Sequence, residues 1–550
     1  MGTGSGEPSG RTGTVRQEAM APAVPAAKAV FMKSRRLMPG MLLQPHLAGN
    51  LARQPLRWYA GITTDPGEHL TAADNSTQPS RGRALSAWQK FTYSLGNFGV
   101  GYAPATFAFL AYYYYGRETA AGEKLVLVPV TAYSIIWFLC NALNGITDPV
   151  VGYLSDRTRS RLGRRKPWVL LGAPLLALSF YFVWAPPDTT PTLANQVVLF
   201  AALFGFWFFF TVVVGPYLAL LPEITPYDNE RVKLSALMSV FGDVLGTLGG
   251  NLLPVFVALL AGGLLIFTNG YQALAFLGAL AVLAFSVLAV SFVKERYQPP
   301  ESDSGDSRGW LRRALGEFRS TFHNPAFPPY LVGVFFYRTA IMITLTLTPF
   351  VATKIIGAVE PSAGDLDILA LLPGVVNDRG LPDFEQAAGY LMMVVLVGAM
   401  LLFVPVSALA ARLGKKKLFV VALFLLGGVL GGMSLIGLVP VLTPLGQALL
   451  LFALAAVPVA IALVVTRPLL ADVIDADEEI TGLRREGVYN GMEGLIMKVA
   501  AGLGPLLAGI IFEIFGASRA HSLGIRICGP VAGACLVLAA FAFRRYPIEK

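Results

Sequence analysis

Charge within apolar sequence is the first chemical feature of this chain. Asp148 stands in the apolar run of CNALNGITDPVVGYLSDRTRSRLGRRKPWVLLGAPLL, residues 140–176, and six cations follow it within residues 157–166. A carboxylate at the centre of a bilayer costs at least about 2.5 kcal/mol, so it is retained where it pairs or serves an ion or substrate pathway. The cations must stay in water. This stretch therefore predicts a buried ion-binding group beside a solvated loop.

Four more ionisable residues fall within long apolar runs. Asp243 lies in the glycine-rich stretch SVFGDVLGTLGG, and Glu493 opens a run near the C-terminus. Arg338 and Arg467 each present a planar guanidinium fork that suits a carboxylate or a phosphate. We predict that all four line a substrate cavity. The alternative is that the arginines reach the membrane surface or pair with Asp243.

Polar and aromatic side chains accompany these charges. An aromatic platform suits a sugar ring, whereas aromatic packing between helices is the competing interpretation. The further candidates for the cavity are Asn97, Tyr102, Trp137, Tyr217 and Tyr489.

The elements that position these residues are helices long enough to cross a membrane. Of the 550 residues, 55% are hydrophobic and only 14% are charged, whereas soluble domains carry about a quarter charged residues. The mean hydropathy is +0.60. An apolar run of about 20 residues crosses the hydrocarbon core as a helix. We predict an all-α integral membrane protein with twelve transmembrane helices, at roughly 91–115, 124–153, 167–187, 195–222, 232–260, 268–293, 328–357, 388–413, 416–438, 445–472, 491–516 and 522–545.

The net charge of +9 gathers in alternate loops and does not indicate a nucleic-acid partner. Segments 154–167 and 412–417 are basic, and 294–320 is also rich in Arg and Lys, whereas 185–196 has no Lys or Arg and 358–387 is acidic. Basic loops stay on the cytoplasmic side, so both termini are predicted to be cytoplasmic. We expect a multi-pass protein of the cell (inner) membrane, with an organelle membrane as the alternative.

The domain boundaries follow from composition. Residues 1–86 are rich in Gly, Pro, Ala, Ser and Arg, which predicts a disordered N-terminal extension. Part of it lacks acidic residues, as organelle presequences do. The polar segment 294–327 is predicted to be a central cytoplasmic loop between six-helix bundles at 87–293 and 328–550.

Catalytic and metal chemistry are not indicated. Cys140, Cys528 and Cys535 fall inside predicted spans and fit no zinc spacing. The four histidines lie outside the predicted hydrocarbon or at its edge. We therefore expect no enzyme activity, no bound metal, and no cofactor beyond a coupling ion, H⁺ or Na⁺. The expected partners are a small-molecule substrate and the lipid bilayer, and the expected state is a monomer.

The junction between the second and third spans recurs in both halves. It reads DPVVGYLSDRTRSRLGRRKPWVLLG in the first half and VPVSALAARLGKKKLFVVALF in the second. Two related six-helix bundles are typical of alternating-access carriers, with the substrate site near the middle of the membrane. The fuller copy resembles the loop signature of the major facilitator superfamily. We predict a cytoplasmic gate, in which glycine allows close helix approach and arginines form ion pairs, from Gly152, Asp156, Arg157, Gly163, Arg164 and Arg165. A loop that only sets topology is the alternative.

Three blocks carry a narrower resemblance. TDPVVGYLSDRTRSRLGRRKPW at 147–168, GPYLALLPEITPYDNER at 215–231 and LLADVIDADEEITGLRREGVYNGMEGLIMKVAAGLG at 469–504 are similar to the glycoside–pentoside–hexuronide:cation symporter family, of which melibiose permease is the familiar member. The blocks occur in matching order, and the similarity covers about 88–545. The vertebrate sodium-dependent lysophospholipid symporter belongs to the same broad branch, so membership does not fix the substrate.

The resemblance implies a cation-coupling site with fewer charges than in sugar-transporting members. Of the acidic pair that they place in the second span, Asp148 is kept and the other position is Asn144. The lysine of the eleventh span is kept as Lys498.

Three other positions of the family's sugar and sodium site depart from its pattern. The first-span carboxylate falls at Gly101, the fourth-span carboxylate at Val214, and the sugar-contacting arginine of the fifth span near Met238. The sodium and sugar chemistry of those members is therefore not carried over to this chain.

We predict that Asp148, Asn144 and Lys498 couple a cation to transport. Asp148 would pair with Lys498 across the two bundles and exchange the ammonium for a proton or a metal cation in another state. Proton coupling needs only the carboxylate, whereas a sodium site needs several further oxygens. The first prediction for the substrate is a glycoside or related small polar solute. The alternatives are a lysolipid or other amphiphile, an organic anion, or a receptor or scaffold that transports nothing.

Overall fold

The computed structural model describes residues 85–118, 124–225, 227–260, 270–295, 316, 318–373, 375–376, 382–483 and 485–548. Within these ranges the side chains of residues 153, 156, 228 and 258–260 are not described. The predicted disordered extension, 1–86, lies outside the described residues except for its last two.

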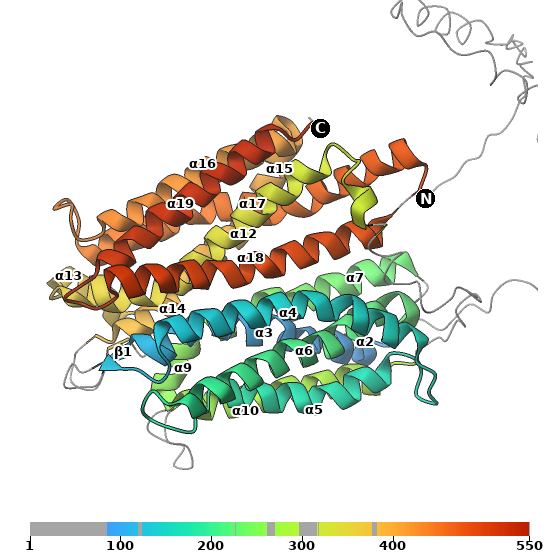
Figure 1. The fold of residues 1–550 in the computed structure, drawn as a ribbon, viewed down its shortest axis with the longest axis horizontal. Helices are drawn as coiled ribbons and strands as arrows, with labels where there is room; N and C mark the ends of the chain where they lie inside the picture. The colour runs from blue at the N-terminus through green and yellow to red at the C-terminus, as the bar shows by residue number, and fades with distance from the viewer. Residues whose placement is uncertain are drawn as a thin grey trace, which may run out of the picture. The chain divides into compact units, whose positions relative to one another are not determined.

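The first bundle consists of helices joined by short connections (Figure 1). In the labels, α marks an α-helix, η a 3₁₀ or π segment and β a strand. Its elements are α2 (Ala87–Leu95), α3 (Asn97–Thr106), η3 (Phe107–Phe109), η4 (Tyr112–Gly116), β1 (Arg117–Glu118), β2 (Lys124–Leu125), α4 (Val130–Arg157), α5 (Lys166–Val183), α6 (Leu193–Ile224), α7 (Asp228–Ser239), η5 (Val240–Gly246), α8 (Thr247–Asn251), α9 (Leu253–Leu260) and α10 (Gly270–Ser291).

The second bundle follows the central polar segment. Its elements are α12 (Phe327–Phe350), η7 (Val351–Ile355), η8 (Ile356–Ala358), α13 (Ala363–Ala370), α14 (Phe384–Leu401), α15 (Phe403–Leu413), α16 (Lys415–Gly432), η9 (Met433–Leu435), α17 (Pro444–Thr481), α18 (Glu486–Phe515) and α19 (Leu523–Arg544).

The length of the apolar runs explains why these segments are helices. Among the described residues, 11 helices are long and apolar enough to cross a membrane. Within hydrocarbon a helix satisfies its own backbone hydrogen bonds, which an isolated strand cannot do. The predicted all-α membrane fold is therefore confirmed.

The first predicted span, 91–115, is a chain of four short segments, α2, α3, η3 and η4. Gly96, Phe107 and Ala111, which join them, all keep right-handed helical dihedral angles. Pro104 lies inside α3 and has no N–H to donate, which weakens the helical ladder just before the 3₁₀ turn. The span therefore stays helical while its hydrogen-bond pattern changes along its length.

A small antiparallel hairpin follows this span and was not predicted. β1 pairs with β2 through Arg117 opposite Leu125 and Glu118 opposite Lys124. The hairpin fixes Glu118 at one end of the first bundle.

The two bundles meet along α4 and α18, which lie side by side (Figure 1). The indole Nε1 of Trp137 in α4 donates to the carbonyl of Ala501 in α18 at 3.1 Å. A Cβ added at Gly509 would lie 1.8 Å from Ser134 Oγ, so only glycine fits there. Glycine at such crossings lets helix backbones approach closely.

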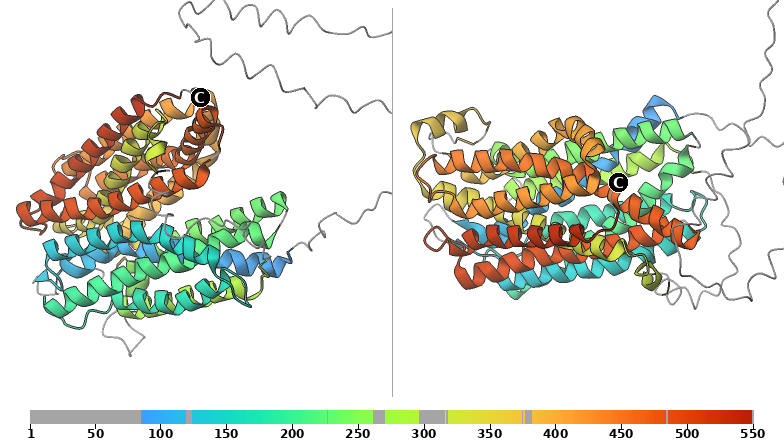
Figure 2. Two further views of the ribbon diagram at one scale, coloured as in Figure 1. Left: turned by 45° about the vertical axis from the view of Figure 1, so that its right-hand side comes forward. Right: turned by 90° about the horizontal axis from the view of Figure 1, so that it is seen from above.

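The two ends of the bundles differ in charge. The basic end carries the turn at 158–165 and Lys415–Lys417, and the acidic end carries β1 and α13. Figure 2 shows the ribbons of the two bundles closer together at the acidic end than at the basic end.

Candidate functional site

One ion pair joins the bundles within the membrane-spanning helices. Asp148 Oδ2 of α4 lies 2.5 Å from Lys498 Nζ of α18. Lys498 Nζ also donates to the backbone carbonyl of Asn144 at 3.2 Å. The Asp148 side chain is 46% exposed and that of Lys498 22%, so the carboxylate keeps an open side that a small ion can reach. The structure thus brings together all three residues predicted for cation coupling.

Hydroxyl and amide oxygens complete this site. Thr211 Oγ1 of α6 lies 2.7 Å from Asp148 Oδ1 and 3.0 Å from Asn144 Oδ1. Thr147 Oγ1 lies 3.2 Å from the same Asn144 oxygen. Sequence reasoning missed Thr211. Its signal was a hydroxyl within the apolar run FTVVVGPY, on a span for which the family pattern drew attention to Val214 instead.

A cavity of about 450 Å³ opens beside this pair. It runs along α4 and α6 from Asn144 and Asp148 to Ser155 and Arg165 near the basic end. Val214, where sugar-transporting relatives have a carboxylate, also lines it. The Asp148 carboxylate therefore faces a cavity that leads toward the basic end.

A second cavity, of about 220 Å³, lies between α8 of the first bundle and four helices of the second. Apolar side chains of α12, α14, α16 and α17, such as Ile341, Met392 and Phe452, form most of its wall. Thr247 and Asn251 of α8 close it from the first bundle. Space of this kind between bundles is where a transported solute would be expected to bind.

Several residues predicted for the substrate cavity instead hold helices of the first bundle together. Asn97 Nδ2 donates to the carbonyl of Met238 at 2.9 Å. Tyr217 and Tyr93 each donate their hydroxyl to the other's backbone carbonyl, at 2.7 and 2.6 Å. The Tyr102 ring is buried, and its centre lies 6.1 Å from that of the Phe180 ring in α5. Packing between helices accounts for all of these contacts.

The four charged residues predicted for the substrate cavity occupy different environments. Asp243 is exposed on η5, one turn before Thr247 of the second cavity. Arg338 is partly buried in α12, and Arg467 is exposed on α17. Glu493 is buried and accepts from the hydroxyl of Tyr330 at 2.5 Å. Trp137, the remaining aromatic candidate, makes the contact between bundles described above.

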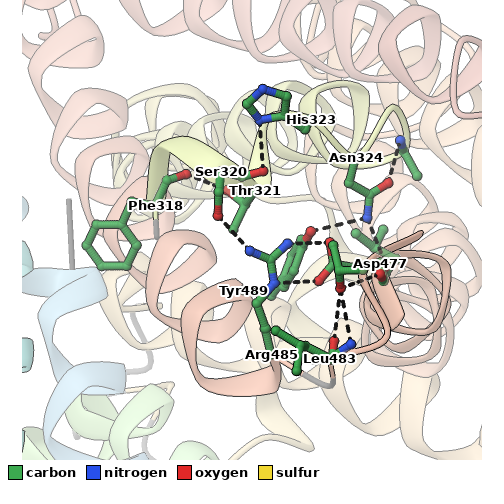
Figure 3. A network of polar contacts seen from close by, with 12 residues as sticks. Phe318, Ser320, Thr321, His323, Asn324, Asp477, Leu483, Arg485 and Tyr489 are labelled. Carbon is green, nitrogen blue, oxygen red and sulfur yellow. Dashed lines mark hydrogen bonds and ion pairs between the residues drawn. The ribbon is translucent and has the colours of Figure 1, made fainter. Parts of the chain in front are cut away.

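Tyr489 belongs to a polar network at the basic end of the second bundle (Figure 3). The Arg485 guanidinium binds both carboxylate oxygens of Asp477, at 2.8 and 2.5 Å, and donates to Ser320 Oγ at 2.6 Å. Asn324 Nδ2 donates to the Tyr489 hydroxyl at 3.3 Å. The Asp477 carboxylate raises the pKa of Arg485 above its ordinary value. The network ties the start of α18 to the end of α17 and to the segment before α12, away from both cavities.

The predicted gate residues form ion pairs within the first bundle. Arg164 and Arg165 both pair with Glu223 of α6, the latter at 3.1 Å. The backbone N–H groups of both arginines also donate to Glu295 Oε1, at 2.7 and 3.1 Å. Gly163 has a φ of 110°, which side chains disfavour, so glycine suits this turn.

No close helix approach is seen at Gly152 in the described conformation. A Cβ added there would have no atom within 4 Å, so the role predicted for this glycine in closure stays a prediction. Arg157 is the last residue of α4, and the side chain of Asp156 lies outside the described part of the chain. Closure of the basic end by this loop stays a prediction.

A second cluster of charges joins the bundles at the acidic end. Glu118 of β1 lies 2.6 Å from Lys354 Nζ of η7, and its other oxygen lies 3.6 Å from Arg519 Nε. We call these three residues the Glu118 cluster. The Lys354 side chain is only 3% exposed, and its ammonium also lies 5.9 Å from the centre of the Tyr112 ring. The cluster therefore holds the acidic ends of the bundles together, and nothing in the sequence pattern indicated it.

Gly101 shows why one carboxylate of the family pattern is missing. A Cβ added there would lie 1.9 Å from the backbone oxygen of Gly242 in η5. Any side chain at this position would collide with that carbonyl, because the first and fifth spans pack backbone to backbone here.

We expect Gly101→Ala to destabilise the folded protein by about 1–3 kcal/mol, because the added methyl overpacks a backbone contact. The measurement is the melting temperature of purified protein in detergent. Gly152→Ala is the matched control, since its Cβ meets no atom within 4 Å and should leave the melting temperature unchanged. Equal melting temperatures for the two variants would contradict this contact.

The sequence and the fold both have known counterparts. The sequence pattern of the family described as MFS/sugar transport protein matches residues 92–375 and 381–550. The uncharacterized symporter sll1374 of Synechocystis is 29% identical over 495 residues, covering 78% of this chain and 85% of that protein.

Two shorter matches and one solved structure extend the comparison. The sucrose transport protein SUC4 of Arabidopsis thaliana is 32% identical over 139 residues, covering 22% of this chain and 27% of that protein. The sodium-dependent lysophosphatidylcholine symporter 1-A of Danio rerio is 30% identical over 174 residues, covering 31% of each chain. The crystal structure of the nucleoside transporter NupG superposes with a TM-score of 0.57, at 12% identity, over 84% of this chain and 99% of that one.

Proposed function

Because this chain belongs to the MFS/sugar transport protein family and is a cation-coupled secondary transporter, we propose that Asp148 carries its coupling ion, as a proton. The resemblance to the glycoside–pentoside–hexuronide:cation symporters is confirmed by the same matches. The observation that supports the proposal is the ion pair of Asp148 with Lys498 across the two bundles.

Exchange of partners at Asp148 links the ion to the conformation. In the state described here the carboxylate holds the Lys498 ammonium, which joins α4 to α18. A proton on Asp148 neutralises the carboxylate and removes the attraction, so the two helices are free to separate. A ligand shifts a conformational equilibrium only as far as its affinities for the two states differ, and the proton meets this condition here.

Sodium is the second candidate ion, and the oxygens around the pair favour it. Asp148, the side chain and carbonyl of Asn144, and the hydroxyl of Thr211 lie close enough together to surround a small cation. Lys498 Nζ contacts two of these residues, so its ammonium would have to leave before a metal ion entered. We rank the proton first because it needs only the Asp148 carboxylate and no set of surrounding oxygen ligands.

The transported solute is a small organic molecule whose class the relatives do not decide. The names of two partial relatives point in different directions, one to sucrose and one to lysophosphatidylcholine. The glycoside predicted from the family remains a prediction. We propose that the basic end faces the cytoplasm, that the protein lies in the cell membrane as a monomer, and that the Glu118 cluster closes the opposite side.

The test is solute uptake into proteoliposomes under controlled gradients. The solutes are 4-nitrophenyl β-galactoside and 4-nitrophenyl sulfate, which share one aromatic body. Uptake is measured under three conditions. These are an inward proton gradient, an inward sodium gradient at equal pH, and no gradient. We expect accumulation only with the proton gradient and its loss on adding a protonophore. Accumulation with sodium alone would select the second ion, and uptake that neither gradient accelerates would contradict coupling.

A further inference from the structure

Arg338 is a partly buried cation of a membrane-spanning helix, and the described residues give it no anionic partner. It lies near the middle of α12, its Nε is buried, and that nitrogen has no hydrogen-bond acceptor. Among the described residues, no carboxylate forms an ion pair with Arg338. A charge placed in this way is costly unless something pairs with it. The partner that the described part of the chain does not supply is an anion.

The position of Arg338 on its helix points to the second cavity. Residues three and seven positions further on share a helix face with a given residue. These are Ile341 and Leu345, and both line the 220 Å³ cavity. Tyr337, the residue before Arg338, lines it as well. Arg338 is therefore on a helix face that adjoins the cavity wall, and it is not one of the residues that line the cavity.

The wall of the cavity does not suit a sugar. Thr344 and Thr348 each donate their hydroxyl to a backbone carbonyl of α12 at 2.8 Å. Thr247 donates in the same way to the carbonyl of Gly242 at 3.3 Å. Three of the polar side chains have thus used their single donor, and most of the remaining wall is apolar. A sugar would leave hydroxyls without partners, which costs affinity.

We propose that the transported solute is an amphiphilic organic anion. Its carboxylate, sulfate or phosphate binds Arg338, and its apolar body fills the cavity between α8, α12, α14, α16 and α17. A guanidinium binds such groups through two parallel hydrogen bonds. This inference rests on the proposed function, because it assumes that the space between the bundles holds the transported molecule.

A pair between Arg338 and Asp243 in another conformation is the competing explanation. Asp243 is exposed on η5 and precedes Thr247, which lines the same cavity, by one turn. If the two charges only meet during the transport cycle, each single neutral variant should be impaired and the double variant should recover. If Arg338 holds the solute, Asp243→Asn cannot compensate for its loss.

The experiment is equilibrium binding to the full chain in lipid nanodiscs, measured by calorimetry. The probes are 4-nitrophenyl sulfate, 4-nitrophenyl β-galactoside and 4-nitroanisole, which present a sulfate, a sugar or a methyl group on one ring. We expect the sulfate to bind at least about tenfold more tightly than either other probe, or about 1.4 kcal/mol. Arg338→Gln should abolish this preference, whereas Arg338→Lys, which keeps the charge without the fork, should retain part of it.

Two controls make the experiment decisive. Arg467→Gln removes the exposed arginine of α17 and should leave the preference for sulfate intact. The double variant Arg338→Gln with Asp243→Asn should bind the probes as Arg338→Gln alone does. A sulfate that binds no better than the other probes, or a preference that survives Arg338→Gln, would overturn the inference. So would recovery in the double variant. If the galactoside alone is accumulated along a cation gradient, the anion inference fails while the coupling proposal stands.

Discussion

Asp148→Asn is expected to abolish solute accumulation driven by a cation gradient while leaving solute exchange across the membrane. The carboxamide neither binds a proton nor attracts the Lys498 ammonium, so the link between ion and conformation is lost. Coupling between two binding events typically amounts to 5- to 150-fold, so accumulation should fall by about 100-fold. The measurement is gradient-driven uptake set beside counterflow exchange in the same proteoliposomes.

Glu493→Gln is the matched control for this prediction. It also replaces a carboxylate of a membrane-spanning helix with a carboxamide, but its site is the buried contact with Tyr330, which a glutamine oxygen can still accept. It should accumulate solute as the unmodified protein does. If both variants lose accumulation equally, or if Asp148→Asn keeps it, Asp148 is not the coupling residue.

Lys354→Gln is expected to open the acidic end of the protein. This change removes the charge that Glu118 binds at 2.6 Å, and the lysine side chain is only 3% exposed. Breaking a buried pair by removing one partner costs about 3–5 kcal/mol. A loss of about 3 kcal/mol from the closed state would shift its equilibrium with the open state by more than about 100-fold.

Labelling of an introduced thiol measures this shift. Thr348→Cys places the thiol in the lining of the second cavity, and a membrane-impermeant maleimide is added on the side of the acidic end. We expect slow labelling in the background protein and fast labelling with Lys354→Gln. Arg519→Gln should change little, because that side chain is 56% exposed and lies 3.6 Å from Glu118. The double variant Glu118→Lys with Lys354→Glu, which swaps the two residues, should restore slow labelling. Equal labelling rates in all variants would contradict closure of the acidic end by the Glu118 cluster.

The fold could be predicted because its signal is local. A run of apolar residues of membrane-crossing length predicts a helix whatever lies around it, and the charges that break the runs mark the ends. The pairing of Asp148 with Lys498 followed from the same reasoning, since two charges retained in apolar helices need partners. The family resemblance then placed both on helices that face each other.

The parts that could not be predicted depend on which helix faces meet. Asn97, Tyr217 and Tyr489 looked like cavity residues, because a polar tip within an apolar helix has the same pattern whether it meets a ligand or a neighbouring backbone. Thr211 was missed because one hydroxyl among apolar residues is common, and only its distance to Asp148 distinguishes it. The Glu118 cluster joins segments far apart in sequence, so no local spacing reveals it.

The hydrogen bond between Trp137 and Ala501 joins the two bundles at a point about which one bundle can rotate against the other. For a rotation about this hydrogen bond, Asp148 lies about 16 Å from the rotation axis along α4, at 1.5 Å per residue. A rigid-body rotation of about 15°, a size found in other proteins, would move Asp148 by about 4 Å. This travel exceeds the 2.5 Å that now separates Asp148 from Lys498, so a modest tilt of one bundle is enough to change the partner of the carboxylate.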